Sequence, residues 1–92
     1  NNDLWVKLAT NYIVHEKNNK GFPINDVCRF HLGNGAIVDD IIVNANISEV
    51  GFKRSFGVMV NYLYELNSIE KNHEDFINHK KVNISNKLKK YL

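Results

Sequence analysis

The stretches AIVDDIIVNA (residues 36–45) and GVMVNYLYEL (residues 57–66) decide the fold class. β-Branched residues dominate the first stretch, which predicts a strand with Asp39 and Asp40 in its middle. We expect one of these carboxylates to face solvent and the other to lie near an edge or a bulge. The second stretch alternates and predicts another strand, with a helix as the alternative for so apolar a run. Its predicted common face carries Val58, Val60, Tyr62, Tyr64 and Leu66.

Two helices are predicted before the first strand. Residues 3–17 follow Asp3, a suitable cap, and repeat apolar side chains at spacings of three and four. The predicted apolar face consists of Leu4, Trp5, Leu8, Ala9, Tyr12 and Ile13. A second, shorter helix should open with Pro23 and close at Asn34-Gly35, since proline suits a first turn and glycine a C-terminus. Its predicted buried side consists of Ile24, Val27, Cys28 and Leu32.

Three more helices complete the predicted order. They run from Ser48 to about Phe56, from Ser68 to about His79, and from Ser85 to Leu92. Asn67 is the expected cap of the middle one, with Glu70 completing a pair like a capping box. The fold class is therefore α+β, in the order α-α-β-α-β-α-α. Two strands cannot form a self-sufficient sheet, so we expect these residues to be a fragment of a larger domain.

Composition excludes several classes of protein. The chain has 92 residues, 43% of them apolar, which is too apolar for a disordered segment. We expect no membrane partner, because no apolar run reaches about 18 residues and no charged-then-apolar leader opens the chain. A net charge of +2 is too small to argue for nucleic acid. Cys28 is the one cysteine, so an internal disulfide is excluded and a reducing, intracellular compartment is favoured.

The basic C-terminal segment has two interpretations. Residues 71–92 carry six Lys against Glu74 and Asp75. Such a segment can contact phosphates or an anionic ligand, or it can be the solvated face of a helix. The solvated face is the simpler interpretation.

Few side chains here suggest chemistry by themselves. His15, His73 and His79 have no metal-ligand spacing, so no metal site is expected. His31 lies at the end of an apolar helix, just before a Gly-Asn-Gly turn, which suits either a structural histidine or a base tuned by the helix end. A tyrosine pair, Tyr62 and Tyr64, can be core or can donate hydrogen bonds to a developing oxyanion. Cys28 is expected to be an inert core thiol.

The blocks RFHLGNGA (29–36), GVMVNYLYEL (57–66) and IEKNHEDF (69–76) together resemble the C-terminal end of malonyl-CoA decarboxylase. The upstream helix LWVKLATNYIV is similar to the segment before the family's Pro-x-x-x-Val-x-x-Phe-His-Leu stretch, which here is PINDVCRFHL. Order and spacing of the blocks agree over nearly the whole chain.

The resemblance implies an acetyltransferase-like (GNAT-type) catalytic domain, of which residues 1–92 are the C-terminal portion. It implies decarboxylation of malonyl-CoA to acetyl-CoA and CO₂ without metal or prosthetic group, in a homo-oligomer. The family's active-site histidine falls on His31 and its tyrosine on Tyr64. The serine that pairs with the histidine belongs to an earlier block with no counterpart here, so the chain alone is expected to be inactive.

Some positions depart from the family. The strand after the histidine block usually carries an Arg-(Leu/Ile)-Asn-Trp run, and here it is DDIIVNAN; VGFKRS replaces the usual Arg-Gly-Leu. The alternatives are an acyl-CoA transferase or non-catalytic acyl-CoA binder of the same fold, and a basic interaction module. A mitochondrial or cytoplasmic location is expected, because Lys90-Tyr91-Leu92 does not match the Ser-Lys-Leu peroxisomal address.

Overall fold

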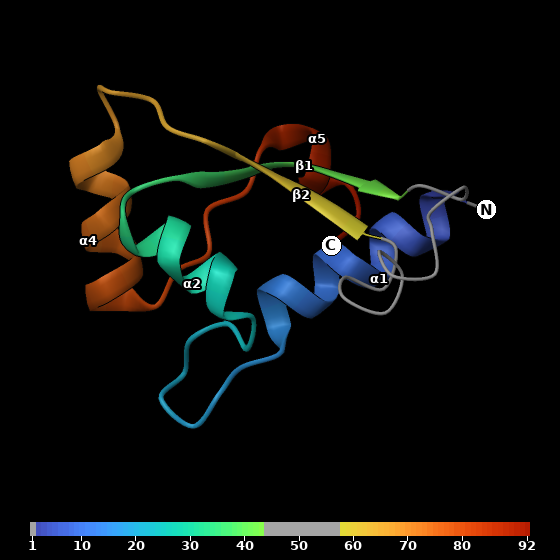
Figure 1. Ribbon diagram of the computed structural model, residues 1–92, viewed down its shortest axis with the longest axis horizontal. Helices are drawn as coiled ribbons and strands as arrows, with labels where there is room; N and C mark the ends of the chain where they lie inside the picture. The colour runs from blue at the N-terminus through green and yellow to red at the C-terminus, as the bar shows by residue number, and fades with distance from the viewer. Residues whose placement is uncertain (1, 44–57) are drawn as a thin grey trace.

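The computed structural model describes residues 2–43 and 58–92 (Figure 1). Its elements are α1 (Asn2–His15), α2 (Asp26–Gly33), β1 (Ile37–Val43), β2 (Val58–Leu63), α4 (Ile69–His79) and α5 (Asn86–Lys89). This is an α+β architecture, as predicted. The helix predicted over residues 48–56 lies outside the described residues, so the full predicted order stays a prediction.

The two predicted strands pair in an antiparallel sheet, in which Ile41 is opposite Val60. The register shifts between Val38 and Asp40, which confirms the bulge expected at the aspartates. The two carboxylates share one environment, because the Lys87 ammonium lies 3.5 Å from Asp39 and 3.8 Å from Asp40, and 33% and 37% of the two side chains are exposed.

The second strand is shorter than predicted. It ends at Leu63, whose partner Ile37 is the first residue of β1, so Tyr64 and Leu66 have left the sheet. The side chain of Leu66 is 88% exposed rather than on the sheet's inner face. Strand β2 ends at Leu63 because no residue of β1 is left to pair with it. The residues before Ile37 form the turn that closes α2.

Helix α2 starts later than Pro23. The side chain of Asn25 caps it by accepting a hydrogen bond from the Cys28 backbone N–H at 2.9 Å, while Pro23 pairs with Lys17 in an isolated bridge. Of its predicted buried residues, Cys28 and Leu32 are buried. Ile24 precedes the helix and Val27 faces outward, so both are exposed.

The C-terminal caps also differ from the prediction. Ser68 rather than Asn67 is the N-cap of α4, and no side-chain bond caps the helix, so the capping box with Glu70 does not form. Helix α5 has four residues instead of reaching Leu92. Its N-cap Ser85 donates its hydroxyl to the Asp39 carbonyl at 2.6 Å, which ties α5 to the bulge of β1.

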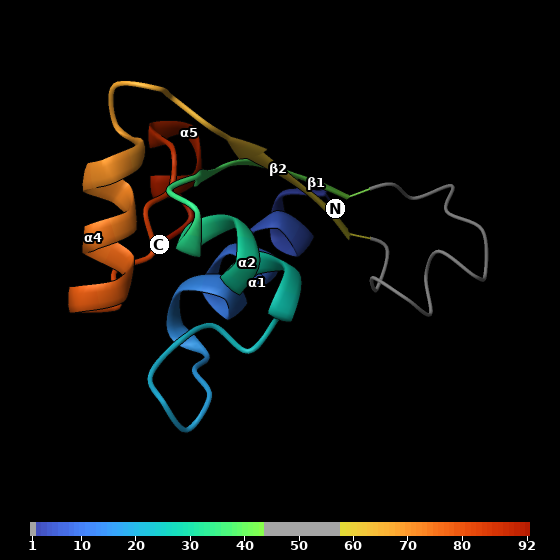
Figure 2. The same cartoon turned by 60° about the vertical axis from the view of Figure 1, so that its left-hand side comes forward.

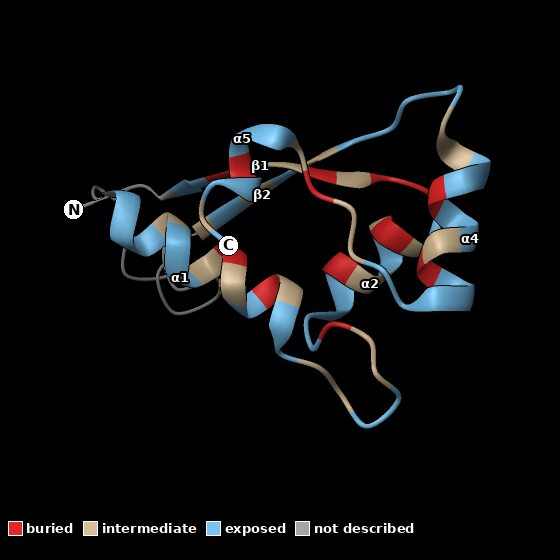
Figure 3. Ribbon diagram, turned by 180° about the vertical axis from the view of Figure 1, so that it is seen from behind, coloured by how far each residue is buried: buried red, intermediate tan, exposed pale blue. Residues whose placement is uncertain are grey.

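One face of the sheet packs on α1 and α2, and α2 packs on α4 (Figures 1 and 2). The segment before α5 follows the outer edge of β1, where Val38 exchanges backbone hydrogen bonds of 2.9 Å with Asn83 and Ser85. Within the described ranges, no strand pairs with the outer edge of β2. The buried apolar residues form one cluster, and Figure 3 shows in red where buried residues lie along the ribbon. The cluster consists of Ile13, Cys28, Leu32, Val38, Ile41, Phe76, Ile84 and Leu88.

Helix α1 confirms the predicted helix but not its buried face. Ile13 is buried, whereas Trp5 and Leu8 are each 53% exposed, and Leu4 and Tyr12 are exposed as well. This part of the chain therefore presents an apolar helix face to the outside.

Candidate active site

His31 lies in the last turn of α2, where the sequence places the candidate base. The helix closes through hydrogen bonds to the His31 carbonyl, from the backbone N–H groups of Asn34 (3.1 Å) and Ala36 (3.0 Å). Gly35 has φ +92°, a left-handed conformation that suits glycine, and β1 begins two residues later. The half-buried His31 side chain is thus carried by a short helix–turn–strand unit.

Helix α4 holds that turn from outside. The Asn72 side chain, 8% exposed, donates to the Gly35 carbonyl at 3.1 Å, and its own oxygen accepts from Asn83 at 3.2 Å. The Gly33 carbonyl lies 2.6 Å from His73 Nδ1, which donates to it as the protonated nitrogen. Sequence reasoning missed this support, and its only signal was the position of both residues inside the IEKNHEDF block.

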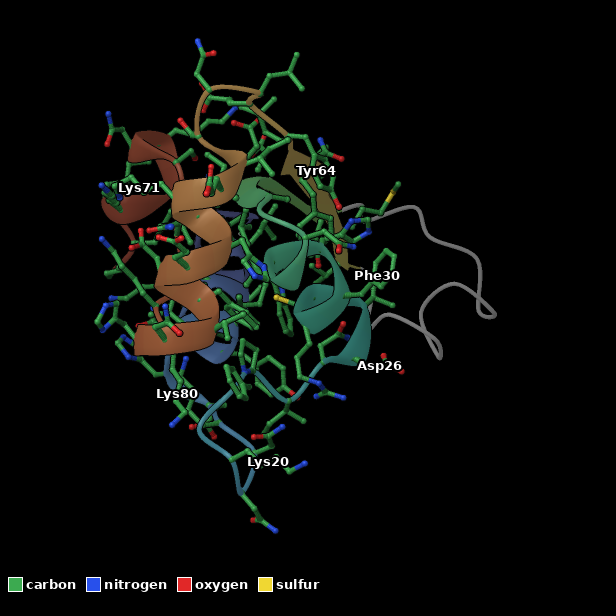
Figure 4. All side chains as sticks on the ribbon, turned by 90° about the vertical axis from the view of Figure 1, so that its left-hand side faces the viewer. Lys20, Asp26, Phe30, Tyr64, Lys71 and Lys80 are labelled. Atoms are coloured by element: carbon green, nitrogen blue, oxygen red, sulfur yellow. The ribbon has the colours of Figure 1, made fainter. Side chains whose placement is uncertain are left out.

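Tyr64 is the first residue beyond β2, and the structure brings it to His31. Its hydroxyl lies 2.6 Å from His31 Nδ1, although 33 positions separate the two residues. Their rings meet edge to face, with centroids 5.9 Å apart. Tyr64 lies on the same side of the molecule as Phe30 of α2, away from Lys71 and Lys80 of α4 (Figure 4). The two catalytic residues predicted from the sequence are therefore in direct contact.

Tyr62 is a third member of this group. Its ring stacks on the His31 imidazole with centroids 4.2 Å apart and planes 22° apart. Burial, followed by the nearby Cys28, raises the pKa of Tyr62 above its ordinary value. Period-2 alternation placed Tyr62 and Tyr64 on one face, but it gave no means of telling their roles apart.

Cys28 is enclosed beside this group, with 1% of its surface exposed. Burial raises the pKa of its thiol, and the nearby Tyr62 hydroxyl only partly opposes that effect. A neutral, buried thiol is a poor nucleophile, which supports the inert core role predicted for Cys28.

The other histidines lie elsewhere: His15 and His79 end α1 and α4 and are exposed. Over residues 2–43 and 58–92, no three His, Cys, Asp or Glu side chains are grouped closely enough to hold a metal ion. In the same ranges, no helix is long and apolar enough to cross a membrane.

An open apolar cleft of about 700 Å³ adjoins the aromatic group between α1, α2 and β2. Tyr62 connects the two features, since it stacks on His31 and also lines the cleft. The other side chains that line it are Trp5, Leu8, Ala9, Tyr12, Ile13, Asn25, Val27, Cys28, Val58 and Val60. The cleft is thus formed in part by the same exposed face of α1 that the described residues leave uncovered.

Comparison with known proteins identifies the family. The sequence profile of the malonyl-CoA decarboxylase C-terminal domain matches residues 2–92. The chain belongs to the malonyl-CoA decarboxylase family. The rat protein named "Malonyl-CoA decarboxylase, mitochondrial" is 34% identical to it over 83 residues, which is 90% of this chain and 17% of the rat protein.

Solved malonyl-CoA decarboxylases share the fold. The crystal structure from Rhodopseudomonas palustris has a TM-score of 0.91 and 37% identity over 98% of this chain. The one from Agrobacterium vitis has a TM-score of 0.89 and 35% identity over 97% of it. The chain spans 21% and 22% of those two chains, about a fifth of their length. The predicted family is therefore confirmed.

Proposed function

We propose that the full-length protein decarboxylates malonyl-CoA to acetyl-CoA and CO₂, and that these 92 residues supply His31 and Tyr64 to its active site. The 2.6 Å contact between His31 Nδ1 and the Tyr64 hydroxyl carries this proposal, in a chain that belongs to the decarboxylase family. Two titratable side chains from distant positions meet at the C-terminus of a helix, where a base can be oriented.

The active site must stabilise an enolate and supply a proton to carbon. Loss of CO₂ from a malonyl thioester breaks the bond between C2 and the carboxylate and leaves its electron pair as an enolate, with negative charge on the thioester oxygen. A proton must then reach C2 to give the acetyl thioester. An oriented hydrogen-bond donor stabilises the enolate, and a hydroxyl paired with a histidine gives C2 its proton and is reprotonated by water.

One tautomer of His31 lets both side chains act. If Nδ1 carries the proton and donates to the Tyr64 oxygen, the Tyr64 O–H is left to donate to the thioester oxygen. Nε2 then has a lone pair with which to polarise a serine hydroxyl. We propose this arrangement, with the serine supplied by another part of the full-length enzyme and with no metal or prosthetic group.

The proposal also concerns the parts of the full-length protein outside these 92 residues. We propose that residues 1–92 are the C-terminal portion of an acetyltransferase-like catalytic domain and are inactive alone. The exposed Trp5 and Leu8 of α1 and the adjoining cleft support a partner within the same polypeptide, since relatives are about five times longer. We also propose a homo-oligomer located in mitochondria or cytoplasm, which light scattering of the full-length protein and cell fractionation test.

The decisive experiment measures CO₂ release by the full-length protein from malonyl-CoA labelled in its free carboxylate. The wild type should release label, and His31→Asn should lower kcat about a hundredfold or more, because the base is lost. His15→Asn, at the exposed end of α1, is the matched control and should keep the wild-type rate.

Other results of this experiment would contradict the role of His31 or the decarboxylase function. Wild-type kcat in His31→Asn would remove His31 from the reaction. Transfer of an acyl group to an acceptor without CO₂ release would indicate an acyl-CoA transferase, and binding without turnover an acyl-CoA-binding domain. Salt-sensitive binding of RNA without either activity would indicate a basic interaction module.

A further inference from the structure

We propose that Tyr62 is a positioning residue, whose stacked ring fixes the plane of the His31 imidazole so that its two nitrogens face their separate partners. This inference rests on the proposed function and assigns Tyr62 a role distinct from that of Tyr64. The contact that carries it is the parallel stack at 4.2 Å and 22° between Tyr62 and His31.

The hydrogen bond to Tyr64 does not orient the imidazole completely. It fixes Nδ1 at 2.6 Å from the hydroxyl, but the ring can still swing about that direction and carry Nε2 away from its partner. A flat surface against the imidazole face removes this freedom. The Phe30 ring meets His31 at 80° from another direction, so the stacking surface comes from Tyr62.

Tyr62 is itself well held. It lies within β2, opposite Val38, whose side chain is fully buried. Its side chain lies near Cys28, three residues before His31 on α2, and both residues line the same cleft. The strand thus meets the helix that carries the base at two points, beside Cys28 and through the ring stack on His31.

The ring and the hydroxyl of Tyr62 should differ in importance. A thiol sulfur is a weak acceptor, so loss of the tyrosine hydroxyl removes little, whereas loss of the ring removes the whole stacking surface. Tyr62→Phe keeps the ring without the hydroxyl, and Tyr62→Leu keeps an apolar side chain without the ring. This pair separates stacking from hydrogen bonding and from simple packing.

The test compares CO₂ release by full-length wild type, Tyr62→Leu and Tyr62→Phe. Tyr62→Leu should lower kcat about tenfold with KM within about twofold, because substrate binding survives while the base is misaligned. Tyr62→Phe should lose about threefold or less. Tyr91→Leu is the matched control, a half-buried tyrosine remote from His31, and should keep kcat near the wild-type value.

A second measurement reads the stack without activity. In the full-length protein with ¹³C-labelled histidine, the His31 ring resonances should be shifted upfield by the Tyr62 ring. Tyr62→Leu should abolish that shift and Tyr62→Phe should retain it. If Tyr62→Leu does not fold, Tyr62→Met fills the space with a flexible side chain. It should show the same loss of kcat and the same loss of the His31 shift as expected for Tyr62→Leu.

Three results would overturn the inference: wild-type kcat in Tyr62→Leu, equal losses in Tyr62→Leu and Tyr62→Phe, or a His31 shift that is unchanged without the ring. Failure of the proposed function is distinguishable, because wild-type protein would then release no CO₂. The resonance shift would still decide whether Tyr62 orients His31.

Discussion

His31 combines one short hydrogen bond with contacts to three aromatic rings. Phe30 approaches edge-on at 5.3 Å, Tyr62 stacks at 4.2 Å, and Tyr64 meets Nδ1 through its hydroxyl. A histidine so enclosed is pre-oriented before substrate arrives, which is what general acid–base chemistry requires of it.

Tyr64 should matter less than His31 for turnover. We expect Tyr64→Phe to lower kcat for CO₂ release about tenfold, since one donor to the enolate is lost while the base remains. Tyr91→Phe, which removes a hydroxyl remote from the site, should have little effect. A loss larger than that of His31→Asn would make Tyr64 the more important residue.

The raised pKa values of Cys28 and Tyr62 predict how stability varies with pH. Both groups stay protonated in the folded protein, while in the unfolded chain the thiol ionises near its ordinary value of 9.0. The unfolded state then binds fewer protons, so the free energy of unfolding should fall as pH rises above about 9. In urea denaturation of the full-length protein, Cys28→Ala should make this fall shallower. An unchanged slope would show that Cys28 ionises alike in both states.

At the scale of elements, helix α4 serves the site without contributing a reacting group. It is attached to the turn after α2 by two hydrogen bonds. Asn72 donates to the Gly35 carbonyl, and His73 donates to the Gly33 carbonyl. The turn connects His31 to β1, and β1 sets the register of the strand that carries Tyr62. Displacing α4 would therefore disturb the geometry of the base through the backbone.

The two glycines of this turn should respond differently to substitution. At Gly35, φ is +92° and an added Cβ would collide with the backbone and side chain of Ile69, whereas at Gly33 the nearest atom, Phe76 Cε2, is 4.0 Å away. Gly35→Ala should lower the free energy of unfolding by about 2–3 kcal/mol, and Gly33→Ala should be nearly neutral. Chemical denaturation of the full-length variants measures both. Equal effects would contradict the close packing of α4 on Gly35.

At the scale of the whole molecule, the apolar side chains are divided between a core and an uncovered face. The core lies between the sheet and the inner sides of α1, α2, α4 and α5. The uncovered face is that of Leu4, Trp5 and Leu8, beside the open cleft. The paired strands likewise leave one edge of β2 without a partner among the described residues.

If another part of the full-length enzyme covers α1, Leu8 should contribute to stability there. We expect Leu8→Ser to lower the free energy of unfolding by about 1–2 kcal/mol, as for newly buried apolar surface. Lys7→Ser, on the same helix with the same replacement, should change it by about 0.5 kcal/mol or less. Equal losses in denaturation of the two full-length variants would indicate that α1 stays exposed.

Sequence alone predicted much of the fold because its signals are local. β-Branched residues identified β1, alternation identified β2, the apolar repeat identified α1, and the paired aspartates marked the bulge. Caps were less predictable, since Asn25, Asn67, Ser68 and Ser85 are all chemically competent and tertiary contacts choose among them. Ser85, for example, donates to the Asp39 carbonyl instead of capping α5.

The sequence by itself determined the family, the two strands and the identity of His31 and Tyr64 as candidates, because these follow from residue type, order and spacing. Tertiary structure alone decided that the two meet at 2.6 Å, that Tyr62 stacks on the imidazole, and that α4 clamps the turn beneath them. It also decided which apolar faces are buried. Periodicity shows that a helix has an apolar side, but contact between distant segments determines whether anything covers that side.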